Sequence, residues 1–375
     1  MNYRKLGRTG LDVSELGMGL EYLLDKDEHV VVDTIKAAIN GGINYFDCHM
    51  GHDYKEDLIE YEGYHKLGKA LAGIRDRVYI SYISHFMARG INEAQPRFEA
   101  YLRALNTDYT DVYMVQFCDK MKDYEQVTES GGLLSYAKKL QTEGKARYIG
   151  ISTHSATIAY KAIESGDFDV IMYPVNPAFD VLVDEDNYIE NDLGKLWDAA
   201  FDYKSETGNA QLIRKSIYTE CMRHNIGLVA MKPFGGGFIF RDDVNTGFTP
   251  LNLIAYTLTQ TGVSTVVPGC KSTQQIEELL SYYTSPAEVL DFSGAVSSSR
   301  WSIKGNCQYC NHCLPCPADI NIGQVNRVLD NKSAADYRAL EVKASSCIKC
   351  GVCEERCPFD VKVIDKMSLA VETLE

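Results

Sequence analysis

The strongest constraint on the fold is an alternation of short β-branched runs with helix-like stretches over roughly the first 290 residues. The stretches between the runs carry apolar residues at three- and four-residue spacing, as amphipathic helices do. One of them begins at a capping Ser155 and stops at Gly166. The eight runs that we expect to be strands span residues 14–23, 42–47, 78–84, 111–117, 146–152, 169–176, 227–233 and 264–269.

Eight strand–helix units predict an α/β fold, a (β/α)8 TIM barrel. The strands are apolar on both faces, as a sheet covered by helices requires. The alternative is a doubly wound sheet, but no glycine-rich fingerprint follows the first strand. Before that strand, residues 3–16 are expected to form a small hairpin that plugs the barrel floor.

Two segments interrupt or follow the barrel pattern. The stretch between Asn176 and Gly227 is too long for one helix and loop, so it predicts an insertion at 180–210. That insertion is either a lid over the active face or a surface excursion or dimer contact. Residues 289–306 are a linker rich in Ser and Gly, which places a domain boundary near 292. We therefore expect a barrel domain over 1–292 and a second domain over 293–375.

The composition excludes several classes of protein. Hydrophobic residues make up 45% and charged residues 24%, which excludes disorder of the whole chain. The 38 Lys and Arg against 52 Asp and Glu give a net charge of −14, which argues against a nucleic-acid binder. No apolar segment follows the amino terminus and no run of about 18 apolar residues occurs. We therefore expect neither a secretory signal nor a membrane span, and a cytoplasmic protein.

Eight of the 12 cysteines fall in two runs between residues 307 and 357. The second run is C-x2-C-x2-C-x3-C-P, the spacing of bacterial two-cluster ferredoxins, in which the fourth cysteine ligates the other cluster. The first run is one residue shorter before its proline. By this crossed rule, one 4Fe–4S cluster takes Cys307, Cys310, Cys313 and Cys357. The other takes Cys347, Cys350, Cys353 and Cys316.

The alternative for these cysteines is a pair of four-cysteine zinc sites, which also use C-x2-C pairs but have no use for the Cys-Pro ends. Residues 322–340, between the two runs, are expected to be helical and to pack the two halves together. The chain thus ends in a small, mainly helical ferredoxin-like iron–sulfur domain. Two clusters imply one-electron transfer. We therefore expect either a redox partner, such as a ferredoxin or a flavoprotein, or a redox reaction within the chain.

Several barrel segments together resemble the aldo-keto reductases, and the tail resembles their ferredoxin-domain branch. The matching segments are residues 3–19, 42–47, 145–155, the strand that ends in Asn176, 229–237 and 266–280. The resemblance implies an oxidoreductase that acts on a small carbonyl or hydroxyl compound, with NAD(P)H lying across the barrel mouth.

The resemblance also implies which residues hold NAD(P)H. Gly269, Lys271, Ser272 and Gln275 would grip the adenosine phosphate at a helix amino terminus. Ser152 and Asn176 stand at strand ends where family members hold the carboxamide. The backbone of Lys232 and Pro233, with glycines 235–237, would approach the pyrophosphate. For Lys271 the alternative is an ordinary solvated lysine.

The family's catalytic tetrad of Asp, Tyr, Lys and His is altered in this chain. Asp47 stands at the expected end of the second strand, but His52 occupies the tyrosine position and Tyr54 comes two residues later. Ile83 stands where the lysine should end the third strand, and Gln116 where the histidine should end the fourth. Without the lysine, a tyrosine would keep a pKa near about 10 and be a poorer acid.

Four histidines map to strand ends at the barrel mouth: His49, His52, His85 and His154. His52 is a candidate to replace tyrosine as the proton donor, because imidazole titrates near neutral pH. Each of the four could equally be a polar loop residue, and a metal site built from them has no spacing signature. The candidate catalytic residues are Asp47, His52, Tyr54, Gln116 and His154.

Three functions follow from these features. The first is an oxidoreductase that uses NAD(P)H, cluster electrons or both, with a flavin or a radical between the two-electron hydride and the one-electron clusters. The second is a barrel whose altered tetrad performs elimination, isomerase or lyase chemistry without hydride. The third is a non-catalytic electron carrier with the barrel as a docking module. The sequence names neither the substrate nor the oligomeric state.

Overall fold

The computed structural model of the chain describes residues 1–50, 59–84, 88, 90–116, 118–180, 210–240, 247–292, 295, 307, 313–330, 334–357 and 361–375. The chain divides into two compact units. The first comprises residues 1–175, 213–233 and 250–292, and the second comprises 176–212, 234–249 and 293–375. The division into domains 1–292 and 293–375 stays a prediction. Most of the expected insertion, residues 181–209, lies outside the described residues.

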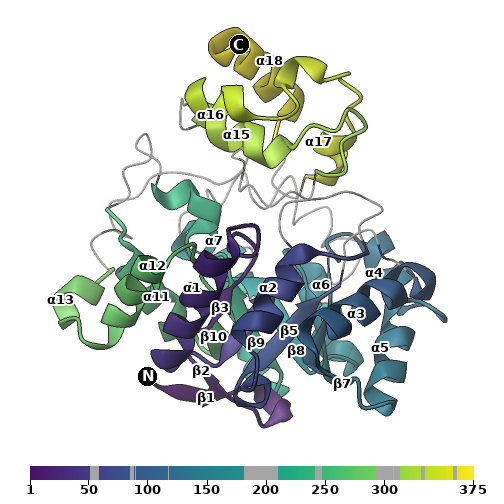
Figure 1. The fold of residues 1–375 in the computed structure, drawn as a ribbon, viewed down its shortest axis with the longest axis vertical. Helices are drawn as coiled ribbons and strands as arrows, with labels where there is room; N and C mark the ends of the chain where they lie inside the picture. The colour runs from purple at the N-terminus through teal and green to yellow at the C-terminus, as the bar shows by residue number, and fades with distance from the viewer. Residues whose placement is uncertain are drawn as a thin grey trace. The chain divides into compact units, whose positions relative to one another are not determined.

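The first unit is built on an eight-stranded parallel sheet whose strands follow one another in sequence order. Figure 1 shows this unit with helices such as α1, α3 and α5 around the strands. Parallel bridges from Leu16 to Val266 and from Gly19 to Gly269 join the first strand to the last. The sheet therefore closes into the predicted barrel, and the doubly wound alternative is excluded. The strands are β3 (Met18–Gly19), β4 (Tyr45–Cys48), β5 (Tyr79–Ile83), β6 (Thr110–Val115), β7 (Ala146–Ser152), β8 (Val170–Pro174), β9 (Gly227–Met231) and β10 (Val263–Val266).

Amphipathic helices connect these strands. The helix expected after β7 is α6, where the Ser155 hydroxyl accepts a hydrogen bond from the Ile158 amide at 3.4 Å and Gly166 ends the helix at φ 71°. The helices of this unit are α1 (Glu28–Asn40), α2 (Glu62–Ala70), α3 (Ile91–Leu105), α4 (Met121–Thr128), α5 (Leu133–Thr142), α6 (Ala156–Ser165), α10 (Ala210–Arg223), α11 (Pro250–Thr259), α12 (Thr273–Leu280) and α13 (Ala287–Leu290).

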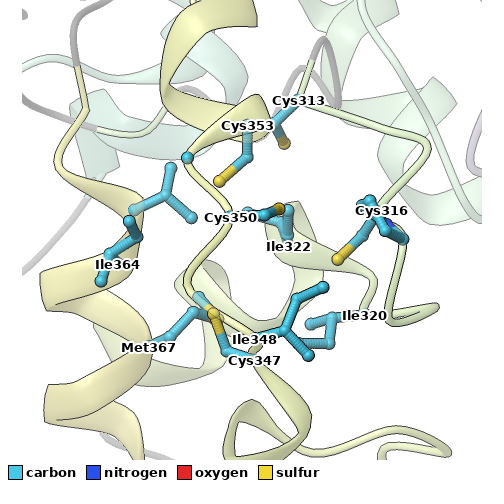
Figure 2. Close-up of a pocket in the computed structure, with 13 residues that line it drawn as sticks. Cys313, Cys316, Ile320, Ile322, Cys347, Ile348, Cys350, Cys353, Ile364 and Met367 are labelled. Carbon is cyan, nitrogen blue, oxygen red and sulfur yellow. The ribbon is translucent and has the colours of Figure 1, made fainter.

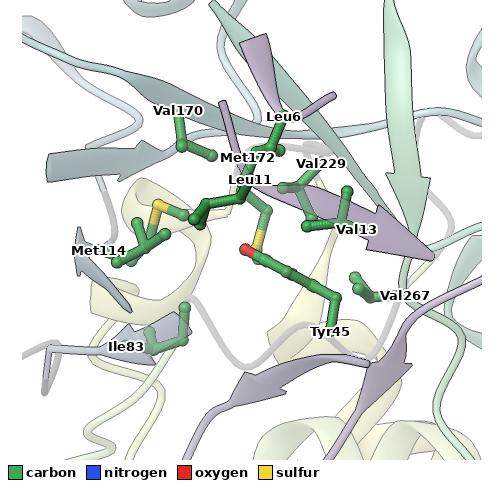
Figure 3. Packing of buried hydrophobic residues seen from close by; sticks show 11 residues of the cluster. Leu6, Leu11, Val13, Tyr45, Ile83, Met114, Val170, Met172, Val229 and Val267 are labelled. Carbon is green, nitrogen blue, oxygen red and sulfur yellow. The ribbon is translucent and has the colours of Figure 1, made fainter. Parts of the chain in front are cut away.

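A hairpin closes the amino-terminal end of the barrel, as the sequence predicts. Strands β1 (Tyr3–Lys5) and β2 (Asp12–Ser14) pair antiparallel. Leu6, Leu11 and Val13 pack against inward-facing barrel residues in one buried cluster (Figure 3). The first barrel strand is shorter than the predicted 14–23, because Ser14 pairs with Tyr3 inside the hairpin and the chain turns directly after β3.

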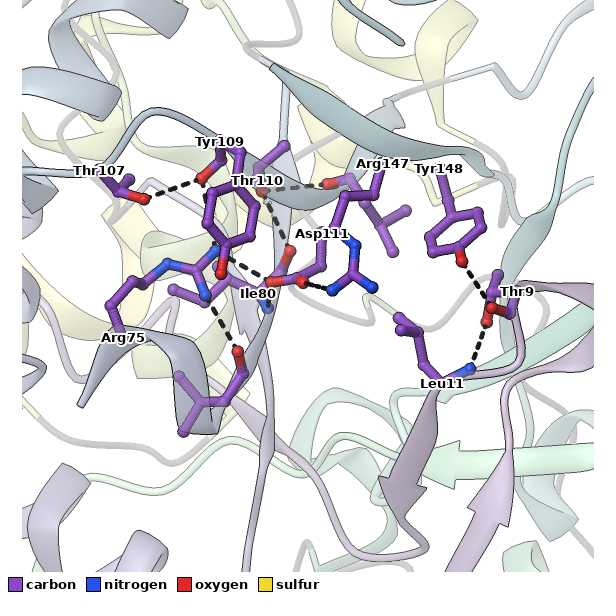
Figure 4. A network of polar contacts seen from close by, with 12 residues as sticks. Thr9, Leu11, Arg75, Ile80, Thr107, Tyr109, Thr110, Asp111, Arg147 and Tyr148 are labelled. Carbon is purple, nitrogen blue, oxygen red and sulfur yellow. Dashed lines mark hydrogen bonds and ion pairs between the residues drawn. The ribbon is translucent and has the colours of Figure 1, made fainter. Parts of the chain in front are cut away.

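A buried carboxylate braces the same end of the barrel (Figure 4). Asp111, near the start of β6, accepts hydrogen bonds from the Arg75 and Arg147 guanidinium groups and from the Ile80 amide, each at 2.9 Å. Asp111 is fully buried, so these donors replace the water that its charge has lost. Because the amino-terminal face of such barrels serves stability, we assign this network to the scaffold.

The second unit is mainly helical in its described part, as predicted. Two of its helices, α15 (Ile322–Asp330) and α18 (Val363–Leu374), pack against each other. Its other elements are α7 (Pro177–Asp180), η5 (Gly235–Phe240), α16 (Ala334–Ala339), η7 (Ala344–Ser346) and α17 (Val352–Arg356). Among the described helices of the chain, none combines the length and the hydropathy needed to cross a bilayer.

Candidate functional site

The alternation of side chains along the barrel strands identifies the residues that face the barrel axis at its carboxyl end. Tyr45 and Met114 belong to the interior cluster of the barrel. Asp47 lies two residues after Tyr45, and Gln116 lies two residues after Met114. Because side chains alternate along a strand, both face the barrel axis, at the carboxyl end where such barrels carry their sites. Ser152 takes the equivalent place at the end of β7, and is buried.

Asp47 is a buried acid without a cation among the described residues. The residue is 9% exposed, and its Oδ1 atom has no hydrogen-bond partner in the described part of the chain. Burial, together with the negative charge of Glu21, raises the pKa of Asp47 well above its usual range. Ile83, at the end of the neighbouring strand, is buried in the apolar cluster and offers no charge. The Asp47 carboxyl group is therefore biased toward its protonated form.

Gln116 is tied to a histidine from another strand end. Its Nε2 amide group hydrogen-bonds His49 Nε2, and His49 Nδ1 is paired with the Met50 carbonyl. This pattern assigns the neutral Nδ1–H tautomer to His49, with Nε2 as the acceptor. The Gln116 backbone amide donates to Ser84 Oγ at 3.2 Å. The sequence placed both side chains at the mouth but gave no signal for their pairing.

His154 is held by a carboxylate that the sequence reasoning missed. Asp119 Oδ1 accepts the His154 backbone amide at 2.6 Å and the Thr153 hydroxyl at 3.2 Å, and Asp119 Oδ2 lies 3.2 Å from His154 Nδ1. Asp119 follows the end of β6 and His154 follows the end of β7. The only sequence signal for this pair is an acid three residues after Gln116.

Three residues that the sequence predicts at the barrel mouth, His52, Tyr54 and His85, lie outside the described residues. Their roles as candidate proton donors or polar loop residues stay predictions.

The expected adenosine-phosphate segment forms a capped helix start. Ser272 Oγ accepts the Gln275 amide at 3.3 Å, and Gln275 Oε1 accepts the Lys271 amide at 2.7 Å. The amides of Thr273 and Gln274 make no hydrogen bond in the described residues, so they are open to an anion. The Lys271 side chain is exposed, and its Nζ lies 5.1 Å from the centre of the Tyr22 ring.

The other predicted contacts to NAD(P)H also stand at strand ends. Gly269 pairs with Gly19 where the barrel closes. Lys232, which has φ 51°, and Pro233 follow β9. In the second unit, Asn176 is fully buried and its carbonyl accepts the Asp180 amide at 3.1 Å. Glycines 235–237 of that unit have φ of 56°, 68° and 93°, which leaves their backbone free of side chains.

Four cysteines that the crossed rule groups together line one cavity in the second unit (Figure 2). They are Cys316, Cys347, Cys350 and Cys353. Cys313, which the rule assigns to the other cluster, also borders this cavity. Burial and the neighbouring Glu354 raise the pKa of Cys353 to about 11, with smaller contributions from Cys316 and Cys347. The remaining lining residues are Pro317, Ile320, Ile322, Ile348, Gly351, Val363, Ile364 and Met367.

The backbone between these cysteines turns the thiols toward the cavity. Lys349 and Gly351 adopt left-handed conformations with φ of 56° and 80°. Such alternating conformations form concave backbone sites that are common around iron–sulfur clusters. Each thiolate of a 4Fe–4S cluster binds a different iron, so four sulfurs around one cavity match this group. Within the described ranges, no three His, Cys, Asp or Glu side chains are arranged to hold a single metal ion.

The structure describes three of the four cysteines of the other expected cluster. Cys307 is buried and Cys357 is half-buried, whereas Cys310 lies outside the described residues. The assignment of all eight cysteines to two clusters therefore stays a prediction.

Comparison with known proteins supports the same two-part organisation. The model of the aldo/keto reductase family matches residues 15–190, and the model of the 4Fe–4S binding domain matches residues 340–363. The aldo-keto reductase YhdN of Bacillus subtilis is 28% identical over 172 residues, which cover 41% of this chain and 48% of that protein. The chain thus spans about half the length of this curated relative.

Solved structures share the fold. An aldo-keto reductase of Bacillus halodurans, solved in its holo form, has a TM-score of 0.55 at 19% identity, and the match covers 79% of this chain and 95% of that one. An aldo-keto reductase of Klebsiella pneumoniae in complex with NADPH has a TM-score of 0.52 at 18% identity, covering 77% and 92%.

These findings show that the barrel unit is similar to the aldo/keto reductases in sequence over residues 15–190 and in fold. More particularly, the chain carries an aldo/keto reductase domain followed by a carboxyl-terminal 4Fe–4S binding domain.

Proposed function

We propose that the barrel reduces a small carbonyl compound, or oxidises the corresponding alcohol, with NAD(P)H. We propose further that the cysteines of the second unit hold two 4Fe–4S clusters that exchange electrons with a protein partner. The observation that carries the barrel proposal is Asp47, a buried acid at the carboxyl end of β4 that no cation in the described residues neutralises. A carboxyl group kept neutral in an apolar site can donate a proton near neutral pH.

The residues present fit a dinucleotide. Lys271 and the open amides at the start of α12 offer a positive charge and two donors to the adenosine phosphate. Ser152 offers a buried hydroxyl for the carboxamide. When bound, NAD(P)H supplies the hydride. The complex of the Klebsiella pneumoniae relative with NADPH supports this choice.

In this proposal, side chains of the barrel supply the proton that the carbonyl oxygen takes up. Asp47 gives its proton to the carbonyl oxygen, in the role that the family assigns to tyrosine. The Gln116 side chain, which hydrogen-bonds His49, orients the carbonyl. His154, which Asp119 holds, is the second proton-carrying side chain at this end of the barrel. His52 and Tyr54 remain further candidates for proton donation.

The clusters pose a problem of electron counting. A hydride carries two electrons and each cluster accepts one at a time. A flavin or a substrate radical must therefore lie between them if the two units share electrons. The alternative within this proposal is that the barrel and the clusters serve different electron donors.

The test is steady-state reduction of a panel of aldehydes and ketones by NADPH and NADH, with reconstituted full-length protein under anaerobic conditions. We expect Asp47→Asn to bind NADPH within about threefold of the unchanged protein and to lose about 10²–10⁴-fold in kcat. Lys271→Ala is the complementary variant, which should raise the KM for NADPH and leave kcat near that of the unchanged protein. Full kcat in the Asp47→Asn variant would overturn the assignment of Asp47.

A second candidate function rests on Ile83 and Gln116, which stand in the places of the family's lysine and histidine. These changes would suit an elimination, isomerisation or lyase reaction that needs no hydride. This candidate predicts that neither NADPH nor NADH binds. Nicotinamide binding, followed by fluorescence, therefore discriminates between the two candidates before any substrate is known. An electron carrier without catalysis would bind neither nucleotide nor substrate.

A further inference from the structure

We propose that Asn326, on α15, donates a hydrogen bond to a sulfur atom of the first 4Fe–4S cluster and raises the reduction potential of that cluster. The first cluster is the one that the crossed rule assigns to Cys307, Cys310, Cys313 and Cys357. The second cluster is the one assigned to the cavity of Figure 2. This inference rests on the proposal that the second unit holds two clusters. It goes beyond that proposal because it gives a residue outside the cysteine runs a role in setting the potential of one cluster and not of the other.

The first observation is that the side chain of Asn326 is buried without a partner. The residue is 0% exposed, and neither its Oδ1 atom nor its Nδ2 atom has a hydrogen-bond partner in the described residues. A buried amide that makes no hydrogen bond is costly, and such groups are rare in native proteins. The described protein atoms do not satisfy this amide, which indicates that it hydrogen-bonds a bound group.

The second observation is an internal repeat that contains Asn326. Residues 316–330 align without a gap to residues 357–371. Both segments begin with Cys-Pro, have an aspartate two residues after the proline, and have isoleucine or valine one and three residues after that aspartate. The helices α15 and α18 begin at equivalent positions of this alignment. Asn326 is therefore the counterpart of Met367 in the other half.

The repeat indicates which cluster Asn326 faces. Met367 lines the cavity of Figure 2, which is assigned to the second cluster. In crossed ligation each half supplies three cysteines to one cluster and the fourth to the other, so exchange of the two halves exchanges the two clusters. The counterpart of Met367 is therefore expected to face the first cluster. Asn326 does not line the cavity of Figure 2, as this assignment requires.

The chemistry of the two side chains makes the clusters unequal. The Nδ2 group of Asn326 has two N–H donors, whereas the thioether of Met367 has none. Reduction adds one electron to a cluster, so an N–H donor at a sulfur atom stabilises the reduced form more than the oxidised form. Hydrogen bonds to the sulfurs are among the features that set the reduction potential of such clusters. Because asparagine is neutral, its exchange for another neutral side chain tests this hydrogen bond without a change of charge.

The experiment is an anaerobic potentiometric titration of the reconstituted full chain, followed by electron paramagnetic resonance. The unchanged protein should show two one-electron reduction steps. Asn326→Met introduces the side chain that the other half carries at this position, and should move one step to lower potential, with the other step and the iron content unchanged. Asn326→Gln keeps the donor and should restore much of the lost potential. The matched control is Met367→Leu, which removes no donor and should move neither step.

A direct readout of the hydrogen bond completes the test. Protein labelled with 15N-asparagine should show an electron spin echo modulation from 15N at one reduced cluster, and Asn326→Met should abolish it. If Asn326→Met takes up no iron, Asn326→Ala serves for the same comparison.

Three outcomes would contradict these expectations. Unmoved reduction steps in an iron-replete variant without the amide would overturn the role of Asn326. Equal movement of both steps would also overturn it, because the effect would then belong to the whole domain. A single reduction step in the unchanged protein, with only about four iron atoms bound per chain, would instead overturn the two-cluster proposal on which this inference rests.

Discussion

Replacement of Asp47 by asparagine should make the barrel more stable and the enzyme less active. In the folded chain, burial raises the pKa of this carboxyl group well above its ordinary value of 3.8, and the group has no partner at Oδ1 in the described residues. In the unfolded chain the group is ionised above about pH 4. The folded state therefore binds a proton that the unfolded state releases, so its stability falls as pH rises toward the folded pKa.

The size of the effect follows from the cost of keeping that proton. One pH unit corresponds to about 1.4 kcal/mol, so a carboxyl group with an unfolded pKa of 3.8 that stays protonated at pH 7 costs at most about 4 kcal/mol. Asparagine has no such cost. We expect the Asp47→Asn variant to be about 1–4 kcal/mol more stable at pH 7, with the gain rising by up to about 1.4 kcal/mol per pH unit until the folded pKa is reached.

The assay is urea unfolding followed by far-UV circular dichroism, for both proteins, at about pH 5.5 to 8.5 under anaerobic conditions. The pH at which the stability difference stops growing reports the folded pKa of Asp47. Infrared spectroscopy supplies an independent check, because a protonated carboxyl band should be present in the unchanged protein and absent from the variant. A stability difference that does not vary with pH, or a less stable variant, would refute this reasoning.

Three further changes test other parts of the structure. Asp111→Ala should lower the free energy of unfolding in urea by about 3–5 kcal/mol, because it leaves the nearly buried Arg75 guanidinium group without its carboxylate. Arg147→Ala should lower it by about 1 kcal/mol or less, because the Arg147 side chain is 44% exposed. Equal losses in the two variants would contradict the network. Asp119→Asn should shift the His154 imidazole to its Nε2–H tautomer, which nitrogen NMR reports, and an unchanged tautomer would count against the pairing. Cys316→Ser should lose about half of the bound iron after reconstitution, and full retention would exclude Cys316 as a ligand.

The barrel was predictable because its signals are local and repeated. The strand–helix alternation appears eight times, and the glycine and serine caps of helices such as α6 lie next to the patterns that they end. The floor hairpin was predicted over residues 3–16, and in the structure Leu6, Leu11 and Val13 pack into the buried barrel cluster. The first barrel strand was not, because Met18–Gly19 is defined by its pairing to distant strands and carries little local signal.

The sequence predicted where the candidate site residues lie but not which residues they hydrogen-bond. The family resemblance placed Asp47 and Gln116 at the ends of two strands, and in the structure Asp47 lies near the end of β4 and Gln116 directly follows β6. The contacts of Gln116 with His49 and of Asp119 with His154 join loops that are far apart in sequence. No sequence spacing encodes such contacts. The same is true of the exposure of Ile348, which depends on what the rest of the fold leaves uncovered.

The spacing of the cysteines predicted part of their arrangement. Their spacing grouped Cys316 with Cys347, Cys350 and Cys353, and these four line one cavity. The spacing did not predict that Cys313 would border the same cavity.

The central claim is that one chain joins nicotinamide chemistry in the barrel to iron–sulfur clusters in the second unit. The most direct test is an anaerobic titration of reconstituted protein with NADPH and NADH, with nicotinamide fluorescence and the cluster absorbance band recorded together. We predict saturable binding of at least one nucleotide, with bleaching of the cluster band when a flavin or a substrate is supplied. Absence of binding by both nucleotides would contradict the claim and turn the search to non-hydride reactions at Asp47 and Gln116.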